Sequence, residues 1–287
     1  MKKIIILLLM IANIWAYQTK ELNPQMQKAF KANQKGDYKT SIAIFKKEAA
    51  KGNPVACESL GECYMWGIGV KQDADKSIYY FKKAIDQNKN TPAKISAIVN
   101  LGNLYRILGK NKEAYVYYKR AIEMGSPNGM RHLGEMYAYG KLGKVDKKKA
   151  KYWYKKAAKL NDVIAMTELG TLYYFGKDYK NALKYFSKAY NLGERDTSAN
   201  FIGLMYYDGQ GLKKDYKKAA RFLQESVKTG NPMAMNMMGI LYVTGRGVSQ
   251  DKIKAYKVWM KAAKLGLKNA QDNLDRLCKE SPWACQK

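Results

Sequence analysis

The sequence predicts an all-α protein: an α/α solenoid in which about seven helix pairs and a terminal helix stack into a right-handed superhelix. Three observations predict it. An apolar-Gly pair followed three residues later by Tyr occurs six times, proline follows a capping residue at five expected helix starts, and glycine stands at five expected helix ends. The glycines of the six pairs lie 41, 32, 36, 33 and 36 residues apart, and a period of this length is typical of helical repeat proteins.

The six motifs mark the first helix of a pair. Ala56, Leu60 and Tyr64 recur at positions i, i+4 and i+8 and therefore lie on one face of a helix. The glycine after the apolar residue stands where the partner helix must approach closely. An aromatic-rich run that ends in Lys-Ala or a close variant follows and predicts the second helix. The motifs are Leu60-Gly61-Tyr64, Leu101-Gly102-Tyr105, Leu133-Gly134-Tyr137, Leu169-Gly170-Tyr173, Ile202-Gly203-Tyr206 and Met238-Gly239-Tyr242.

Proline and glycine mark the expected helix boundaries. Proline suits the first helical position, and the residue before it can accept backbone hydrogen bonds. Such pairs are Asn23-Pro24, Asn53-Pro54, Thr91-Pro92, Ser126-Pro127 and Asn231-Pro232. Second helices end at Gly52, Gly125, Gly193, Gly230 and Gly266, where a left-handed residue is favoured. The predicted units are residues 24–52, 54–88, 92–125, 127–160, 163–193, 196–230 and 232–266, with a terminal helix at 268–280 and a tail at 281–287.

Three units contain paired glycines between their two helices. Phosphate-binding glycine loops follow a strand, whereas these pairs recur at one place in a helical repeat. We therefore interpret them as turns between paired helices. They are Gly67-Ile68-Gly69, Gly209-Gln210-Gly211 and Gly245-Arg246-Gly247.

The start of the chain has the pattern of an export signal. Lys2 and Lys3 precede an apolar run at residues 4–12, and a short segment ending in Ala16 follows. This pattern predicts a secretory signal peptide over residues 1–16 and a folded chain from residue 17 to 287. The run is shorter than the roughly 20 residues that span a bilayer. We expect an exported protein, periplasmic or secreted, without stable membrane insertion after cleavage.

The net charge of +28 comes almost wholly from lysine, since only seven of the 52 cations are arginine. Nucleic-acid readers depend on arginine for bidentate contacts with bases and phosphates. We interpret the surplus as a solvated lysine-rich surface and expect no specific binding to nucleic acid.

One face of the first helices is the candidate binding groove. If the Leu, Gly and Tyr of each motif face neighbouring helices, residues two before Leu, two after it and five after it point the other way. This face is almost free of lysine and carries amides, aromatic rings and a few charges, which suits a protein, an extended peptide or an amide-containing polymer such as peptidoglycan. The alternative is that these are only solvated helix positions. The candidates are Glu62, Asn103, Arg106, Arg131, Glu135, Thr171, Tyr174, Asn200, Tyr207 and Asn236.

These motifs resemble the Sel1-like repeat family, a relative of the tetratricopeptide repeats. The resemblance covers almost all of residues 24–275 and is most complete at 234–255, where Met238 replaces Leu. The units at 97–125 and 163–193 lack the Gly-x-Gly turn and look more like plain tetratricopeptide repeats. The resemblance implies an α/α superhelix whose usual work is to hold other proteins.

The four cysteines form two different pairs. Pro282 ends the last helix, so the chain can fold back and join Cys278 to Cys285; free thiols are the alternative. Cys57 and Cys63 lie six residues apart on one helix, about 9 Å, which is too far for a bridge. We expect both to be buried thiols.

The C-terminal cysteine pair, the signal and the repeats together resemble the Helicobacter cysteine-rich proteins. That resemblance implies a penicillin-binding protein or weak β-lactamase, with a β-lactam as ligand. This chain departs from the family because it lacks a cysteine pair in most repeats.

The sequence itself does not support β-lactam chemistry. Ser249-Gln-Asp-Lys252 and Lys228-Thr229-Gly230 match two strings of serine β-lactamases, but their order is reversed and no Ser-Asp-Asn string occurs. His132 is the only histidine, which excludes a histidine-built zinc centre. We therefore assign no catalytic residue and expect no cofactor and no metal.

Overall fold

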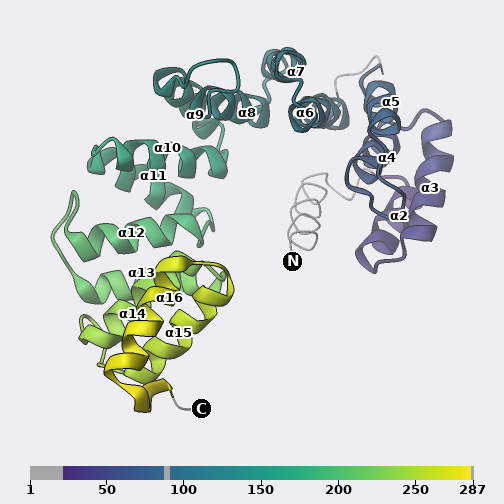
Figure 1. Ribbon diagram of the computed structural model, residues 1–287. Helices are drawn as coiled ribbons and strands as arrows, with labels where there is room; N and C mark the ends of the chain where they lie inside the picture. Colours follow the sequence, from purple (N-terminus) through teal and green to yellow (C-terminus); the bar gives the residue numbers. More distant parts are fainter. Residues whose placement is uncertain (1–21, 87–90, 286–287) are drawn as a thin grey trace. The chain divides into compact units, whose positions relative to one another are not determined.

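The structure is a computed structural model that describes residues 22–86 and 91–285. Every regular element in these two ranges is a helix, which confirms the all-α prediction. The chain divides into two compact units, one ending at Asp146 and the other beginning at Lys147. Figure 1 shows the helices of each unit in chain order. The predicted signal peptide, residues 1–16, lies outside the described residues.

The first unit contains seven described helices, and each packs on the next along the chain. Helix α4 also contacts α6, so the first helices of these two successive pairs lie side by side. The helices are α2 (Pro24–Gln34), α3 (Tyr38–Ala50), α4 (Pro54–Trp66), α5 (Ala74–Ile85), α6 (Pro92–Ile107), α7 (Asn111–Glu123) and α8 (Pro127–Ala138).

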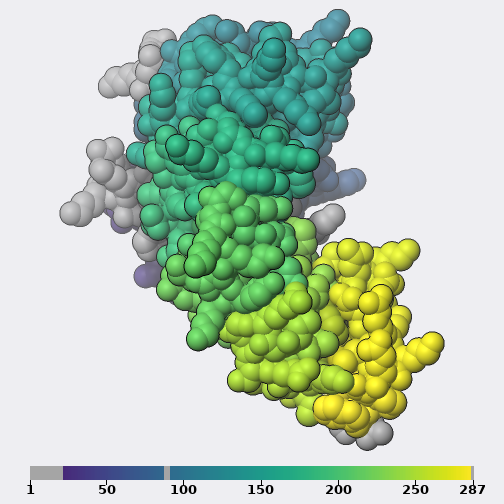
Figure 2. All heavy atoms as spheres, turned by 90° about the vertical axis from the view of Figure 1, so that its left-hand side faces the viewer, coloured from purple at the N-terminus to yellow at the C-terminus, as the bar shows by residue number. Residues whose placement is uncertain are grey.

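The second unit repeats this arrangement and ends in a short 3-10 turn. Figure 2 shows its surface passing from green to yellow as one helix pair follows another. Its helices are α9 (Lys147–Lys159), α10 (Val163–Phe175), α11 (Tyr179–Asn191), α12 (Thr197–Asp208), α13 (Tyr216–Lys228), α14 (Pro232–Thr244), α15 (Lys252–Lys264), α16 (Lys268–Glu280) and η2 (Pro282–Cys285). None of the helices in the described part of the chain has the length and apolar character needed to cross a membrane.

The predicted caps are present at the helix starts. Asn231 Oδ1 accepts hydrogen bonds from the backbone N–H groups of Met233 and Ala234, at 2.9 and 3.1 Å. Equivalent side-chain caps stand before α2, α4, α6 and α8. These bonds satisfy donors that a helix start otherwise leaves open. The proline pattern therefore located five helix starts correctly.

The motif glycines let the two helices of a pair approach closely. A Cβ atom on Gly61 would lie 2.5 Å from the Phe81 ring, and one on Gly170 would lie 2.8 Å from Phe186. In α12 the neighbour is an aliphatic side chain, Leu223. A larger residue at these positions would push the second helix away, which explains why glycine recurs.

The Gly-x-Gly segments are turns, as predicted. Gly67 and Gly69 have φ angles of 70° and 65°, in the left-handed region that glycine tolerates best. Gly69 also packs against Tyr38 at the start of α3. The turn therefore closes one helix pair and contacts the pair before it.

The cysteines are arranged as the sequence indicates. Cys278 and Cys285 form a disulfide with their Cα atoms 5.6 Å apart, and it ties η2 to the end of α16. Cys57 and Cys63 are buried free thiols. Burial raises the pKa of Cys63 to about 12, so this thiol has little thiolate character at neutral pH.

Candidate ligand pocket in the first unit

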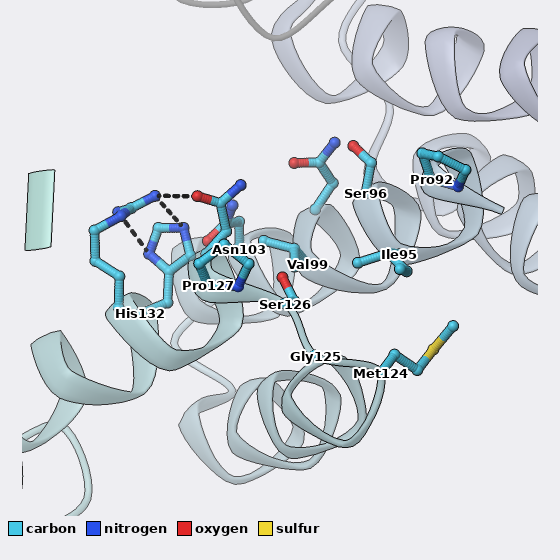
Figure 3. Close-up of a pocket in the computed structure, with 13 residues that line it drawn as sticks. Pro92, Ile95, Ser96, Val99, Asn103, Met124, Gly125, Ser126, Pro127 and His132 are labelled. Carbon is cyan, nitrogen blue, oxygen red and sulfur yellow. Dashed lines mark hydrogen bonds between the residues drawn. The ribbon is translucent and has the colours of Figure 1, made fainter. Parts of the chain in front are cut away.

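The first unit contains a pocket of about 470 Å³ between α6 and α8. Figure 3 shows Pro92, Ile95 and Ser96 at one end, His132 at the other, and Asn103 between them. Its lining mixes apolar side chains with three asparagine amides and contains no lysine. The full lining is Pro92, Ile95, Ser96, Val99, Asn100, Asn103, Met124, Gly125, Ser126, Pro127, Asn128, Arg131 and His132.

Behind one end of the pocket lies a pair of carboxyl groups on α4. Ser96 Oγ donates to Glu58 Oε1 at 2.6 Å. Asn100 Nδ2 donates to Glu58 Oε1 at 3.1 Å and to Glu62 Oε1 at 2.9 Å. One amide therefore bridges two carboxyl groups, and among the described residues neither group forms an ion pair with a cation.

This environment favours the protonated form of both carboxyl groups. Burial raises the pKa of Glu58 to about 7, although the bonds from Ser96 and Asn100 oppose the shift. Burial also raises the pKa of Glu62 well above its usual value, and the neighbouring Glu58 raises it further. Two like charges this close in a buried site are unfavourable. We infer that the pair holds at least one proton at neutral pH.

At the other end, α8 carries a charged network. Arg131 Nη1 donates to Glu135 Oε1 at 2.8 Å, and Arg131 Nη2 donates to Asn128 Oδ1 at 3.3 Å. His132 Nδ1 lies 2.9 Å from Glu135 Oε2. Burial and the Arg131 charge lower the pKa of His132, so the neutral ring donates this bond through Nδ1–H.

Glu135 stays ionised between these two partners. Burial alone would raise the pKa of its carboxyl group, but the His132 bond and the Arg131 charge outweigh that effect, and the pKa falls to about 2. The carboxylate therefore balances the Arg131 charge, and the Arg106 charge, which also acts on His132 and Tyr118, leaves this end of the pocket positive.

A tyrosine on α7 connects the network to the pocket floor. Tyr118 Oη donates to Asn103 Oδ1 at 2.7 Å, and its ring stacks on His132 with centroids 5.2 Å apart. Burial raises the pKa of Tyr118 to about 12, against the lowering effect of nearby Arg106. With this bond in place, the Nδ2 group of Asn103 is left for other partners.

Five of the ten groove residues predicted from the sequence gather here. Asn103 and Arg131 line the pocket. The other three contact groups that line it or support it: Glu62 bonds Asn100, Glu135 bonds Arg131 and His132, and Arg106 lies beside Tyr118.

The remaining five lie in the second unit and are not gathered at one pocket. Thr171 Oγ1 donates to the carbonyl of Thr167 on its own helix. Tyr174 packs edge-on against Tyr179, and Tyr207 packs edge-on against Tyr216.

Asn200 and Asn236 differ from each other in exposure. Asn236 Oδ1 accepts from Asn273 Nδ2 at 2.9 Å, beside a second pocket of about 300 Å³ between α14 and α16. Asn200 is 0% exposed, and neither amide atom has a hydrogen-bond partner in the described chain. It cannot meet a ligand, because α12 turns it into the packed interior, and we remove it from the candidate surface.

The sequence reasoning did not select Ser96, Asn100 or Asn128. They stand five and one residues before Leu101 and five before Leu133, outside the spacing used for the groove. A signal was available, since Asn100 is a polar residue in an otherwise apolar stretch of α6.

The two β-lactamase-like strings are engaged in other contacts. Lys252 Nζ donates to Ser281 Oγ at 2.7 Å, so it serves the C-terminal turn. Thr229 Oγ1 donates to Asp196 Oδ1 at 3.0 Å, after the end of α13. No described contact joins Ser249 to a base, which acyl transfer needs.

Solved structures confirm the solenoid fold. The chain is 25% identical to the protective antigen c5321 of uropathogenic Escherichia coli, with a TM-score of 0.74, covering 88% of this chain and 57% of that one. It is 28% identical to a Sel1 repeat protein from Oxalobacter formigenes, with a TM-score of 0.73, covering 84% and 99%. The Helicobacter pylori cysteine-rich protein B is 28% identical over 46% of this chain and 98% of that one, with a TM-score of 0.36.

A curated relative matches over a shorter stretch. The ERAD-associated E3 ubiquitin-protein ligase component HRD3B of Arabidopsis thaliana is 30% identical over 122 residues. The match covers 40% of this chain and 18% of the relative, so this chain spans under a fifth of that protein.

The profile of the Sel1 repeat matches residues 54–89, 127–162, 163–194, 197–231 and 232–267, and a tetratricopeptide repeat matches 95–124. The prediction that residues 97–125 form a plain tetratricopeptide unit is therefore confirmed, and the same prediction for 163–193 is wrong. That unit replaces the Gly-x-Gly turn with a shorter one in which Lys177 takes the left-handed conformation, at φ 60°. Since the Sel1 segments cover more than half of the chain, this protein belongs to the Sel1 repeat family.

Proposed function

We propose that this protein is an exported scaffold that holds an extended segment of a partner protein in the pocket between α6 and α8. Sel1 repeat proteins act as scaffolds for protein–protein interaction, and the family assignment supports the same role here. The observation that carries the site is the lining: three amides and no lysine, in a chain with 52 cations. Amides pair well with a peptide backbone, which offers a donor and an acceptor at nearly every residue.

Export is part of the proposal. Disulfides persist in oxidising compartments and are rare in the cytosol, so the Cys278–Cys285 bond supports a periplasmic or secreted location. The expected signal peptide at residues 1–16 supports the same location. Fractionation of cells that express the full chain tests it, and recovery of uncleaved protein in the cytosol would contradict it.

Selection of a phage-displayed peptide library on residues 17–287 tests the binding role. We expect enriched peptides to lose at least tenfold in affinity with Asn103→Leu or Asn128→Leu. The control is Asn191→Leu, which changes an exposed amide at the end of α11 and leaves affinity unchanged. Circular dichroism of each variant checks that the fold is kept.

Two results would overturn this proposal. Peptides that bind all three variants equally would place the binding surface elsewhere. Co-sedimentation of the chain with purified peptidoglycan, lost in the pocket variants, together with an empty peptide selection would make the cell wall the partner.

The β-lactam alternative remains the second hypothesis from the sequence. No observation favours it, because Lys252 and Thr229 are engaged elsewhere. Nitrocefin turnover by the refolded mature chain, abolished by a single substitution in that chain, would revive it.

A further inference from the structure

Hydrogen bonds inside the protein fix which atoms the pocket can offer at its Ser96 end. Both N–H groups of Asn100 are used on Glu58 and Glu62, and the Ser96 hydroxyl proton is used on Glu58. Asn100 Oδ1 has no partner among the described residues and Ser96 Oγ keeps its lone pairs. This end therefore presents hydrogen-bond acceptors, with two carboxyl groups directly behind them.

Nearer α8, the hydrogen bonds inside the protein leave donors rather than acceptors for a ligand. Asn103 Oδ1 accepts from Tyr118, and Asn128 Oδ1 accepts from Arg131. The amide groups of both residues therefore have their N–H donors left for a ligand. At Asn128 this assignment of oxygen and nitrogen is required, because a flipped amide would oppose donor to donor at Arg131; at Asn103 it follows the bond that Tyr118 donates.

Acceptors and donors are thus separated along α6. Ser96 and Asn103 lie seven residues apart, about 10 Å along the helix axis. An extended peptide rises about 3.3 Å per residue, so the two ends match a ligand of about three residues.

We propose that the pocket binds a short peptide segment in one direction, with a primary amine against Ser96 and Asn100 and a carbonyl or carboxylate oxygen against Asn103 and Asn128. This inference rests on the proposed function and adds the ligand class. The amine is a chain N-terminus or a lysine side chain. An ammonium group gains from the carboxyl pair behind Asn100, because an ionised carboxylate attracts it through a partly buried site.

Amine binding is coupled to the proton of the carboxyl pair. A positive ligand favours the ionised form of Glu58, whose pKa burial raises to about 7. The groups that face the pair are Ser96 and Asn100 from α6 and the Cys63 thiol from α4 itself. Lys83 on α5 acts on the Cys57 thiol. At the far end of the pocket Glu135 balances Arg131, His132 is neutral, and Arg106 from α6 adds one positive charge.

The test uses four blocked and unblocked tripeptides: Ala-Ala-Ala with both ends free, N-acetylated, C-amidated, and blocked at both ends. A fifth peptide, acetyl-Lys-Ala-Ala-amide, separates a lysine amine from a chain N-terminus. Affinities come from NMR titration of the isotope-labelled chain, residues 17–287, at pH 5.5 and 7.5. The lysine amine stays protonated over this range, whereas the chain N-terminus, with a pKa of about 7.7–8.0, is about two-thirds protonated at pH 7.5, so the lysine peptide gives the cleaner pH comparison.

We expect a free amine to tighten binding at least fivefold at pH 7.5 and less at pH 5.5, where Glu58 is protonated. Asn100→Leu should remove the amine preference, and Asn103→Leu should remove the preference for a free carboxylate. Glu58→Gln keeps an acceptor for Ser96 and Asn100 but removes the group that titrates near pH 7, so it should flatten the pH dependence. Asn191→Leu should change none of these.

Equal binding of acetylated and free peptides would overturn the inference, as would an amine preference that survives Asn100→Leu, or no binding of any tripeptide at 10 mM. These outcomes are separate from failure of the proposed function. Library peptides whose binding requires Asn103 but not a free amine would contradict only this inference. Binding of the tripeptides together with a library selection that enriches no peptide would contradict only the protein-scaffold role.

Discussion

The two units build the same repeat but use one helix position differently. In the first unit Asn100, directly before the Leu101-Gly102 pair, bridges Glu58 and Glu62 on the neighbouring first helix. In the second unit Phe201 stands directly before Ile202-Gly203 and stacks on Phe186, with ring centroids 4.8 Å apart. At the same repeat position, Asn100 joins two helices beside a pocket and Phe201 packs into a hydrophobic core.

The comparison separates what the repeat requires from what it leaves open. The apolar residue and glycine of each motif are buried in both units, as at Leu101 and Leu169. The preceding position is not needed to pair the helices, so it can carry an amide or a ring. We therefore expect functional residues at the helix positions that the repeat motif does not constrain.

The largest expected effect tests the shared part of the repeat. Leu101→Ala and Leu169→Ala each empty a fully buried site and should each lower the free energy of unfolding by about 2–5 kcal/mol. Urea denaturation followed by circular dichroism measures it. Leu192→Ala is the control, since Leu192 is 53% exposed. A large loss in only one unit would break the claim that both share one core.

The next effect is confined to the second unit. Cys285→Ser opens the disulfide, and for so short a loop the chain-entropy model gives about 2–3 kcal/mol. Since repeat contacts are between neighbours, hydrogen exchange should rise around residues 252–280 and stay nearly unchanged at 54–86. Mass spectrometry of the unreduced wild-type chain should count two free thiols, from Cys57 and Cys63. Four free thiols, or none, would refute the assignment.

The two buried acids whose pKa values are raised, Glu58 and Glu62, both lie in the first unit, so a stability change near neutral pH should arise there. The pKa of Glu58 is about 7 in the folded protein and near 4.5 when unfolded, so the folded state binds more protons between these values. Stability from this group is therefore fully present below pH 4.5 and is lost as pH rises through 7. Glu58→Gln should raise the free energy of unfolding at pH 8 by about 2 kcal/mol and remove this dependence. Glu113→Gln, an exposed change on α7, is the control, and an unchanged pH profile in Glu58→Gln would refute the buried-acid reading.

The smallest expected effect concerns the unpaired amide of the second unit. Asn200 is buried without a hydrogen-bond partner among the described residues, and such a group costs about 1–3 kcal/mol. Asn200→Leu should therefore raise stability by about 1 kcal/mol, seen as a higher Tm, while Asn191→Leu leaves Tm unchanged. A loss of stability would mean that Asn200 has a partner, such as a buried water.

The helices were predictable because their signals are local. Asn53-Pro54 begins α4 and Gly67 ends it, and both follow from the preferences of single residues. The role of Gly61 was also predictable, because a glycine that recurs at the same motif position indicates a closely packed partner helix. The identity of that neighbour, Phe81, follows from the period of the repeat.

The pocket was only half predictable because it depends on distances between helices. Helical periodicity assigned Asn103 and Arg131 to the candidate face, and both line the pocket. Helical periodicity assigned Asn200 to the same face, but the packing of α12 buries it. Asn100 was missed because its role comes from the offset between α4 and α6, which no pattern within one helix reveals.

The glycine contacts have a consequence for how this protein can change in length. Each ring or branched side chain that rests on a motif glycine, such as Phe186 on Gly170, comes from the same 32- to 41-residue segment as that glycine. A duplicated segment therefore carries both the glycine and the side chain that packs on it, and deletion of a segment removes both together. A change in the number of units therefore creates new junctions between units, and the pocket between α6 and α8 lies at such a junction.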